Sequence, residues 1–175
     1  MTPKTSLANS IQNLNQIIQP IIGETCHQIG FSYGDELILD FGEMQPYNHP
    51  KLKHLNKGSW QLFTRATPWS LTFGNLLSGI HSSILDIHPN NEFVERLLQQ
   101  LENTKLTNFA LGGNHDFTLT LSFEGEDNCN YKFILEPDLE DDSGLAYWEL
   151  LMPNEQILIV GPGQFWECKS IHECD

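Results

Sequence analysis

The amino-acid sequence predicts an α+β fold that is mainly antiparallel β, with an N-terminal helix and a central helix. Three observations support this prediction. Apolar and polar residues alternate along most of the chain, which is the period of a strand with one buried face. Short polar turns separate these segments, as they do in β-hairpins. An apolar period of three to four residues, typical of a helix, is confined to about residues 5–19 and 90–103.

The first half of the chain is predicted as a helix followed by hairpins. The helix over about residues 5–19 ends at Pro20, and its apolar residues recur at helical spacing: Leu7, Ile11, Leu14 and Ile18. We expect this apolar face to pack on the main body or on a second copy. After Gly23 the period becomes two. Strands are then expected at residues 27–33, 37–41, around Trp60, around Trp69 and at 82–87, with a polar loop over 46–57.

The second half begins with the central helix and returns to the β pattern. Asn90 or Asn91 can cap this helix, and its predicted apolar stripe combines two sets: Phe93, Leu97 and Leu101, widened by Val94 and Leu98. The clearest strand alternates Phe117, Leu119, Leu121 and Phe123 with hydroxyl residues. Further strands are expected at 131–135, 148–152 and 157–160, ending at Gly161-Pro162-Gly163. Trp60 and Trp148 alternate with leucines, so we expect both in the core.

The length of 175 residues fits one domain, residues 1–175. The order of hairpin, loop and Trp-x-Leu occurs twice, at Trp60-Gln61-Leu62 and at Trp148-Glu149-Leu150. This favours a duplicated β-hairpin module with halves 23–88 and 105–163, joined by the helix 90–103. Chance similarity between β patterns is the alternative.

Composition favours a soluble, cytoplasmic protein. The net charge is −14, from 23 acidic and 9 basic residues, which disfavours nucleic acid and anionic lipid as partners and would attract a basic protein. Solubility alone is another reason for such acidity. No apolar run reaches the roughly 18 residues of a membrane helix, and residues 1–10 lack a secretory signal pattern. The four cysteines form no dense disulfide framework, so reduced thiols are expected.

Two motifs share residues with known metal-dependent enzymes. Gly113-Asn114-His115-Asp116, with Asp86-Ile87-His88 upstream, matches two elements of calcineurin-like metallophosphoesterases. The remaining ligands of a binuclear site are missing, so a Gly-Asn turn is expected instead. Asp40-Phe41-Gly42 resembles the metal-binding triplet of kinases, but no glycine-rich loop or catalytic loop accompanies it. We interpret this triplet as a strand end with Phe41 in the core.

Two further clusters have residue types that bind calcium or zinc. Four acidic residues have the spacing of calcium-loop ligands, but Ser143 replaces the glycine that the sharp turn needs: Asp138, Glu140, Asp142 and Glu149. The C-terminal Cys168, His172 and Cys174, with Cys26-His27, match no common zinc module. We therefore predict no metal ligand, no cofactor and no catalytic residue.

The C-terminal segment 146–163, AYWELLMPNEQILIVGPG, and the upstream LTLSF at 119–123 resemble small uncharacterised bacterial proteins. These proteins share a hairpin followed by a W-x-L…V-G-P-G ending, and some are similar to immunity proteins of bacterial toxin systems. The resemblance implies a binding protein, and it carries over no catalytic residue.

The resulting hypothesis is a non-enzymatic protein-interaction domain, immunity-like in one form, with an acidic surface that meets a basic protein. The predicted partner-binding residues are Glu124, Glu126, Asp127, Asp138, Glu140, Asp141, Asp142 and Trp166. One alternative is a small-molecule-binding protein or hydrolase with a site in the β body, using His27, His115 and Arg65. A homodimer through the N-terminal helix is another.

Overall fold

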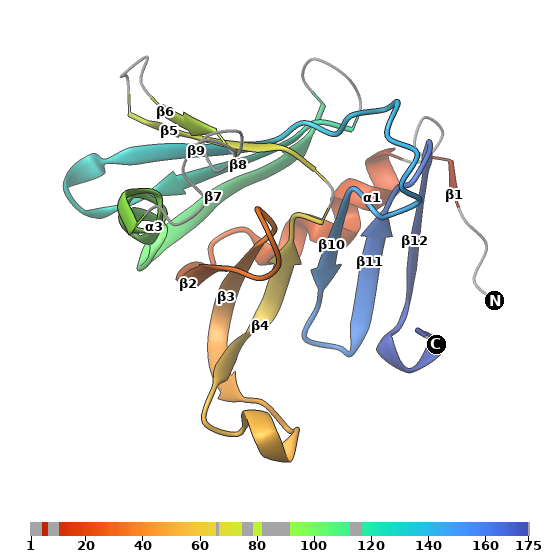
Figure 1. The fold of residues 1–175 in the computed structure, drawn as a ribbon, viewed down its shortest axis with the longest axis horizontal. Helices are drawn as coiled ribbons and strands as arrows, with labels where there is room; N and C mark the ends of the chain where they lie inside the picture. The colour runs from red at the N-terminus through yellow and green to blue at the C-terminus, as the bar shows by residue number, and fades with distance from the viewer. Residues whose placement is uncertain are drawn as a thin grey trace.

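The protein is described by a computed structural model that covers residues 5–6, 11–65, 67–74, 79–81, 92–112 and 117–174. Within these residues, twelve strands form one sheet in which every neighbouring pair is antiparallel. Two short helices lie against the sheet (Figure 1). The prediction of a mainly antiparallel β fold is confirmed, and the helices are a minor part of it.

The strand order differs from the chain order. Across the sheet the strands run β1-β12-β11-β10-β4-β3-β2-β7-β8-β9-β5-β6. Their bounds are β1 Thr5–Ser6, β2 Thr25–Phe31, β3 Leu37–Pro46, β4 Asn56–Phe63, β5 Trp69–Phe73, β6 Gly79–His81, β7 Thr104–Leu111, β8 Leu119–Glu124, β9 Asn130–Leu135, β10 Trp148–Leu151, β11 Gln156–Val160 and β12 Phe165–Ser170.

The sheet folds over on itself, so that two arms face each other. The first arm contains β2, β3, β4, β10, β11 and β12, and the second contains β7, β8, β9, β5 and β6 (Figure 1). Phe41 of β3 stacks on Phe123 of β8 with ring centroids 6.2 Å apart, and Phe109 of β7 meets Trp148 of β10 edge to face at 5.9 Å. These rings come from strands that are not neighbours in the sheet, so the core lies between the arms.

The chain crosses between the arms twice, once from β4 to β5 and once from β9 to β10. Two hydrogen bonds stabilise the first crossing. The backbone N–H of Leu37 donates to Thr64 Oγ1 at 2.9 Å, and Thr67 Oγ1 donates to the carbonyl of Tyr147. Both threonines are buried. Because of the two crossings, each arm contains strands from both halves of the sequence.

The N-terminal helix is shorter than predicted. α1 spans Ile11–Ile18 and continues as the 3-10 turn η2 (Gln19–Ile21). Its buried side chains, Leu14, Ile18 and Ile21, pack on the body of the same chain. The prediction that the helix begins near residue 5 is wrong, because Thr5–Ser6 instead pair with Phe165–Trp166 of β12. Pairing with a distant strand outweighs the local helical period here.

The central helix is present, and most of its predicted apolar stripe is buried. α3 spans Glu92–Leu98 and continues as η4 (Gln99–Leu101), and residues 90–91 lie outside the described part. Val94, Leu98 and Leu101 are buried and Leu97 packs against the core, whereas Phe93 is 60% exposed. The predicted stripe is therefore confirmed except at Phe93.

Several strands were predicted correctly and others were not. Leu119, Leu121 and Phe123 of β8 are buried, as are Trp60 and Trp148, so these predictions are confirmed. In β2 the register shifts between Cys26 and Gln28, which leaves His27 exposed rather than aligned with Ile29. The predicted strand at 82–87 lies outside the described residues. Strands β1, β6, β7 and β12 were not predicted.

No helix in the described part of the chain is long and apolar enough to cross a membrane.

Candidate functional site

The predicted acidic residues lie in two separate places. Glu124 ends β8, and Glu126 lies in the following 3-10 turn η5 (Glu126–Asn128), where the side chain of Asp127 is outside the described part. Residues 138–142 follow the opposite end of β9 (Figure 1). A strand of six residues spans about 20 Å. The predicted acidic surface is therefore two surfaces at opposite ends of one strand.

The second of these, residues 136–145, is held in place by its own side chains and is called the acidic loop below. Asp138 Oδ1 accepts a hydrogen bond from the N–H of Glu140 at 2.9 Å, and Asp141 accepts from both the N–H and the hydroxyl of Ser143. The Ser143 hydroxyl in turn accepts from the N–H of Leu145 at 3.2 Å. Short side chains that bond to nearby backbone groups fix such turns. The loop is therefore ordered before any partner binds.

The acidic loop combines negative charge with exposed apolar side chains. Five of its first seven residues are acidic: Glu136, Asp138, Glu140, Asp141 and Asp142. Leu139 and Leu145 are 47% and 57% exposed. No lysine, arginine or histidine occurs in the sequence from residue 133 to residue 168. Negative charge on the loop is thus not neutralised by neighbours in sequence.

Arg65, a predicted site residue, is already engaged in ion pairs. Its guanidinium contacts Glu149 at 2.5 Å and Glu36 at 3.3 Å, and it stacks over the ring of Phe63 at 4.8 Å. Because one cation lies between two carboxylates, the cluster of Arg65, Glu36 and Glu149 has a net negative charge. These contacts join three elements around the first crossing, so we interpret Arg65 as a structural residue.

The predicted small-molecule site in the β body includes one residue that lies outside the described part, His115. Of the other two, His27 is exposed on β2, and Arg65 is held by Glu36 and Glu149. The site at these three residues therefore stays a prediction.

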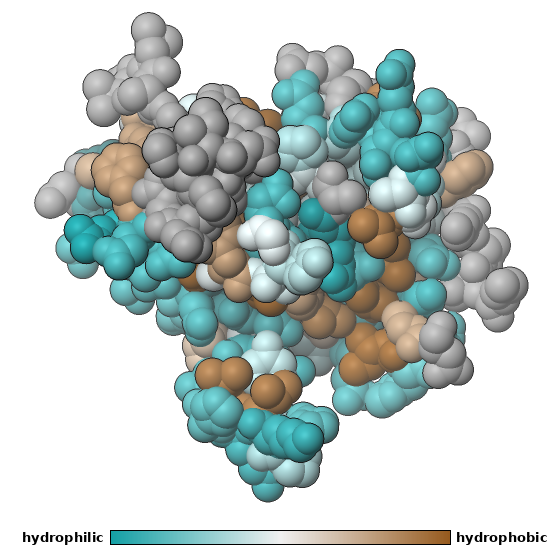
Figure 2. Space-filling model, in the orientation of Figure 1, coloured by the Kyte–Doolittle hydropathy of each residue, from teal (hydrophilic) through white to brown (hydrophobic). Residues whose placement is uncertain are grey.

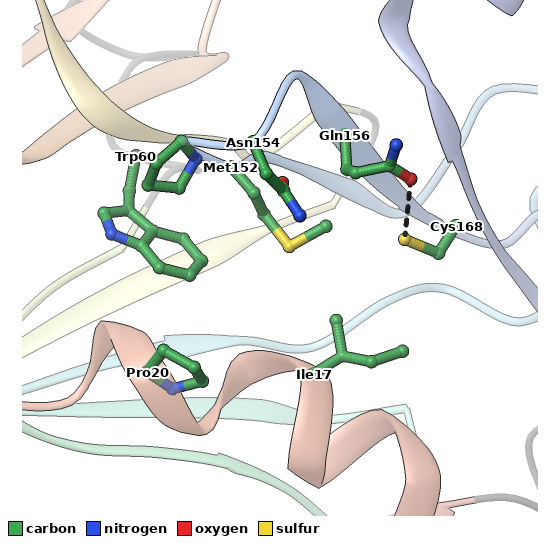
Figure 3. Close-up of a pocket in the computed structure, with 8 residues that line it drawn as sticks. Ile17, Pro20, Trp60, Met152, Asn154, Gln156 and Cys168 are labelled. Carbon is green, nitrogen blue, oxygen red and sulfur yellow. Dashed lines mark hydrogen bonds between the residues drawn. The ribbon is translucent and has the colours of Figure 1, made fainter.

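A groove that the sequence did not predict lies between the N-terminal helix and the first arm (Figure 3). Its volume is about 460 Å³, within the usual size of ligand pockets. In Figure 3, Ile17 and Pro20 face Trp60 and Met152 across the groove. The remaining lining residues are Pro153, Asn154, Gln156 and Cys168. The surface is thus largely apolar, with two amide side chains.

Cys168, on the groove wall, is held as a thiol. Its Sγ donates to Gln156 Oε1 at 3.8 Å, and burial raises its pKa because the thiolate would lose hydration. A neutral thiol is a poor nucleophile. The groove lining contains no histidine and no carboxylate. In the sequence, the sign of this groove is Ile17, which is apolar but lies outside the buried stripe of α1.

A buried carboxyl group lies at the base of the long β3–β4 hairpin. Asp40 is only 5% exposed, and its Oδ1 accepts hydrogen bonds from the N–H of Gly58 at 2.7 Å and from Gln61 Nε2 at 2.8 Å. Gln61 Nε2 also lies 3.2 Å from the Tyr47 hydroxyl. Burial raises the pKa of Asp40, and these hydrogen bonds oppose the rise. The cluster closes the hairpin rather than facing a cavity described here.

Trp166, predicted as a partner-binding residue, lies in β12 opposite Val160 and is only 8% exposed. Its neighbour Phe165 is 45% exposed and is the aromatic side chain on the surface at this point. Alternation along the strand turns these two rings to opposite faces of the sheet. Trp166 therefore contributes to packing and not to the acidic surface.

The clusters considered for metal binding are dispersed. Among the described residues, no three His, Cys, Asp or Glu side chains are grouped so that they could hold a metal ion. Cys26 is buried, whereas Cys174 is exposed at the C-terminal end. His88 and His115 lie outside the described part of the chain.

Comparison with known proteins adds no identity: no protein-family profile, no curated protein and no solved structure matches this chain.

Proposed function

We propose that this protein is a non-enzymatic protein-interaction domain whose acidic loop binds a basic protein. One concrete form is an immunity-type role, in which the partner is a basic toxin and binding blocks its active surface. The observation that carries the proposal is the concentration of five carboxylates in a loop held in one shape by its own hydrogen bonds.

The charge of the acidic loop affects the rate of association, whereas its fixed shape affects the entropy lost on docking. The carboxylates of the acidic loop attract a basic partner over about a Debye length, which raises the association rate. A loop that is already ordered loses less conformational entropy when the partner docks. The exposed Leu139 and Leu145 offer apolar contact area beside the charges. This is the mixture of apolar and charged side chains that protein interfaces use.

The test is co-expression of the tagged protein with the products of neighbouring genes, followed by pull-down at low salt. We expect a basic protein to be recovered. Neutralising three exposed acidic residues, in the variant Asp138→Asn/Glu140→Gln/Asp142→Asn, should weaken binding by about tenfold, because each exposed ion pair contributes about 0.2–1 kcal/mol.

A matched control removes the same charge elsewhere. Glu43, Glu95 and Glu173 are also exposed and lie outside the predicted partner-binding set, and their triple Gln variant has the same net charge as the loop variant. It should retain binding. Recovery of no basic partner, or equal weakening by both triple variants, would contradict the proposal.

A second candidate function, the binding of a small apolar molecule, is favoured by the groove beside α1. Its volume and its apolar lining suit such a ligand, and Asn154 and Gln156 can orient one polar group. Titration with the apolar dye ANS, followed by dye fluorescence, tests it. Ile17→Glu, which places a negative charge on the apolar wall, should repel the anionic dye and reduce dye binding about tenfold. Unchanged binding would argue against this site.

A further inference from the structure

The β3–β4 hairpin extends away from the rest of the molecule (Figure 1). Its strands remain paired as far as Pro46 and Asn56, beyond which the chain forms the 3-10 turn η3 (Pro50–Leu52). Residues 47–57 are called the hairpin tip below. The tip projects from the first arm, whereas the acidic loop lies at the far end of the molecule in the same view.

The hairpin tip carries positive charge on an otherwise acidic protein. It contains three of the nine basic residues and two histidines: Lys51, Lys53, Lys57, His49 and His54. No aspartate or glutamate occurs in the sequence from residue 44 to residue 85. Removing the three lysines from the net charge of −14 leaves −17 on the rest of the chain. Charge of opposite sign is therefore separated in space.

Apolar side chains are exposed among these charges. Leu52 and Leu55 are 38% and 46% exposed. Figure 2 shows hydrophobic surface on the projecting lobe, surrounded by hydrophilic residues. These leucines lie outside the core cluster and offer apolar contact area beside the lysines.

The hairpin tip is also ordered. The N–H of Leu52 donates to the carbonyl of His49 at 2.9 Å, and the N–H of Leu55 donates to the carbonyl of Leu52 at the same distance. The N–H of Tyr47 donates to the carbonyl of Leu55 at 3.1 Å, which closes the tip. Asp40 anchors its base through Gly58. The surface is therefore presented in a single shape.

We propose that the hairpin tip binds an acidic protein segment that also carries apolar side chains. This surface is distinct from the acidic loop and of opposite sign. Its cations are lysines, and the tip contains no arginine, so it lacks the fork that suits phosphate. Tyr47, which could stack on a base, instead lies under Lys57 at 5.4 Å and contacts Gln61. A charge of −17 on the body also opposes extended polyanions such as nucleic acid and anionic membranes.

The experiment measures binding of the full chain to a labelled peptide in which glutamates alternate with leucines, by fluorescence anisotropy at low salt. Replacing Lys51→Gln and Lys53→Gln should weaken binding about three- to tenfold, since two exposed ion pairs are lost. Replacing Leu52→Ser and Leu55→Ser should weaken it by a similar factor. Added salt should weaken binding of the unaltered protein.

The control keeps the net charge of the lysine variant. Lys105 and Lys132 are exposed on β7 and β9, and Lys105→Gln with Lys132→Gln should leave peptide binding unchanged. Circular dichroism checks that every variant folds. Absence of peptide binding, or equal weakening by the control, would overturn the proposal. So would tighter binding to a single-stranded oligonucleotide or to phosphatidylserine vesicles, and salt-sensitive self-association would make a second copy the partner instead.

Discussion

Replacing each of two buried tryptophans by phenylalanine measures what one hydrogen bond contributes to this fold. Trp69 and Trp148 are 2% and 0% exposed. Each has an aromatic neighbour with ring centroids 5.9 Å apart, Phe133 for Trp69 and Phe109 for Trp148. The indole N–H of Trp69 donates to the carbonyl of Asp35 at 2.8 Å, whereas no described residue accepts one from Trp148. The two sites thus differ mainly in this bond.

The expected free energies follow from that difference. Either substitution removes a similar buried volume, which costs about 2 kcal/mol. Trp69→Phe also loses a hydrogen bond, which adds about 1 kcal/mol. Trp148→Phe instead removes a buried unpaired N–H, whose desolvation cost of about 1–3 kcal/mol is recovered. We therefore expect Trp69→Phe to destabilise by about 3 kcal/mol and Trp148→Phe by less than about 1 kcal/mol.

Urea denaturation followed by far-UV circular dichroism tests this difference, because dichroism does not depend on the fluorophore that is removed. Both variants should keep the m-value of the unaltered protein, so that the shift in midpoint reports stability alone. Equal destabilisation by the two substitutions, or a larger loss for Trp148→Phe, would refute the reasoning.

Two further predictions concern a buried carboxyl group and a tight turn. Burial raises the pKa of Asp40, so the folded state holds this proton more tightly than the unfolded state, and the resulting stability falls as pH rises from about 4 through the raised pKa. Asp40→Asn should show a smaller loss of unfolding free energy between about pH 4 and pH 7, and an identical loss would contradict this. At Gly161, with φ +74°, an added Cβ would lie 2.5 Å from the Tyr147 ring, so Gly161→Ala should lower the melting temperature. The cost should be about 2–4 kcal/mol, against about 1 kcal/mol for Gly112→Ala, where φ is +113° and no neighbour lies within 4 Å. Equal melting temperatures for the two glycine variants would contradict the contact with Tyr147.

The sequence predicted correctly those strands whose own residues alternate clearly between apolar and polar. Strand β8 alternates without interruption, and its apolar residues are buried as predicted. β7 was missed because its register shifts between Leu106 and Asn108, which breaks the two-residue period. β12 follows Gly161-Pro162-Gly163, which was interpreted as the end of the sheet, although the chain turns there and pairs with β11. β7 and β12 were therefore missed because a register shift and a glycine-proline turn interrupt the alternating pattern.

The candidate sites were predicted less well, because they depend on which segments come together. The acidic loop was visible as a run of carboxylates, but its separation from Glu124 follows only from the direction of β9. The groove combines α1 and η2 with β4, the β10–β11 turn, β11 and β12, which no local pattern connects. The hairpin tip was predicted as a polar loop, and its projection depends on the ladder between β3 and β4.

The predicted duplication stays a prediction, and the junction between the two halves is a short antiparallel pairing. The N–H of Gly23 donates to the carbonyl of Leu106 at 2.8 Å, and the N–H of Asn103 donates to the carbonyl of Cys26 at 2.7 Å. Residues 23–26 of one half thus lie beside residues 103–106 of the other, as in any antiparallel pair. Gly23 and Asn103 both have positive φ, 99° and 64°.

The two halves of the chain share one order of elements, and in each half that order begins with a helix. α1 is followed by η2 and three strands of the first arm, and α3 by η4 and three strands of the second. In each half the chain then crosses to the other arm, so β5 pairs with β9 and β10 pairs with β4. Neither half can complete its own arm. The exchange explains why apolar faces from both halves bury together, and why the strand order could not be deduced from hairpins alone.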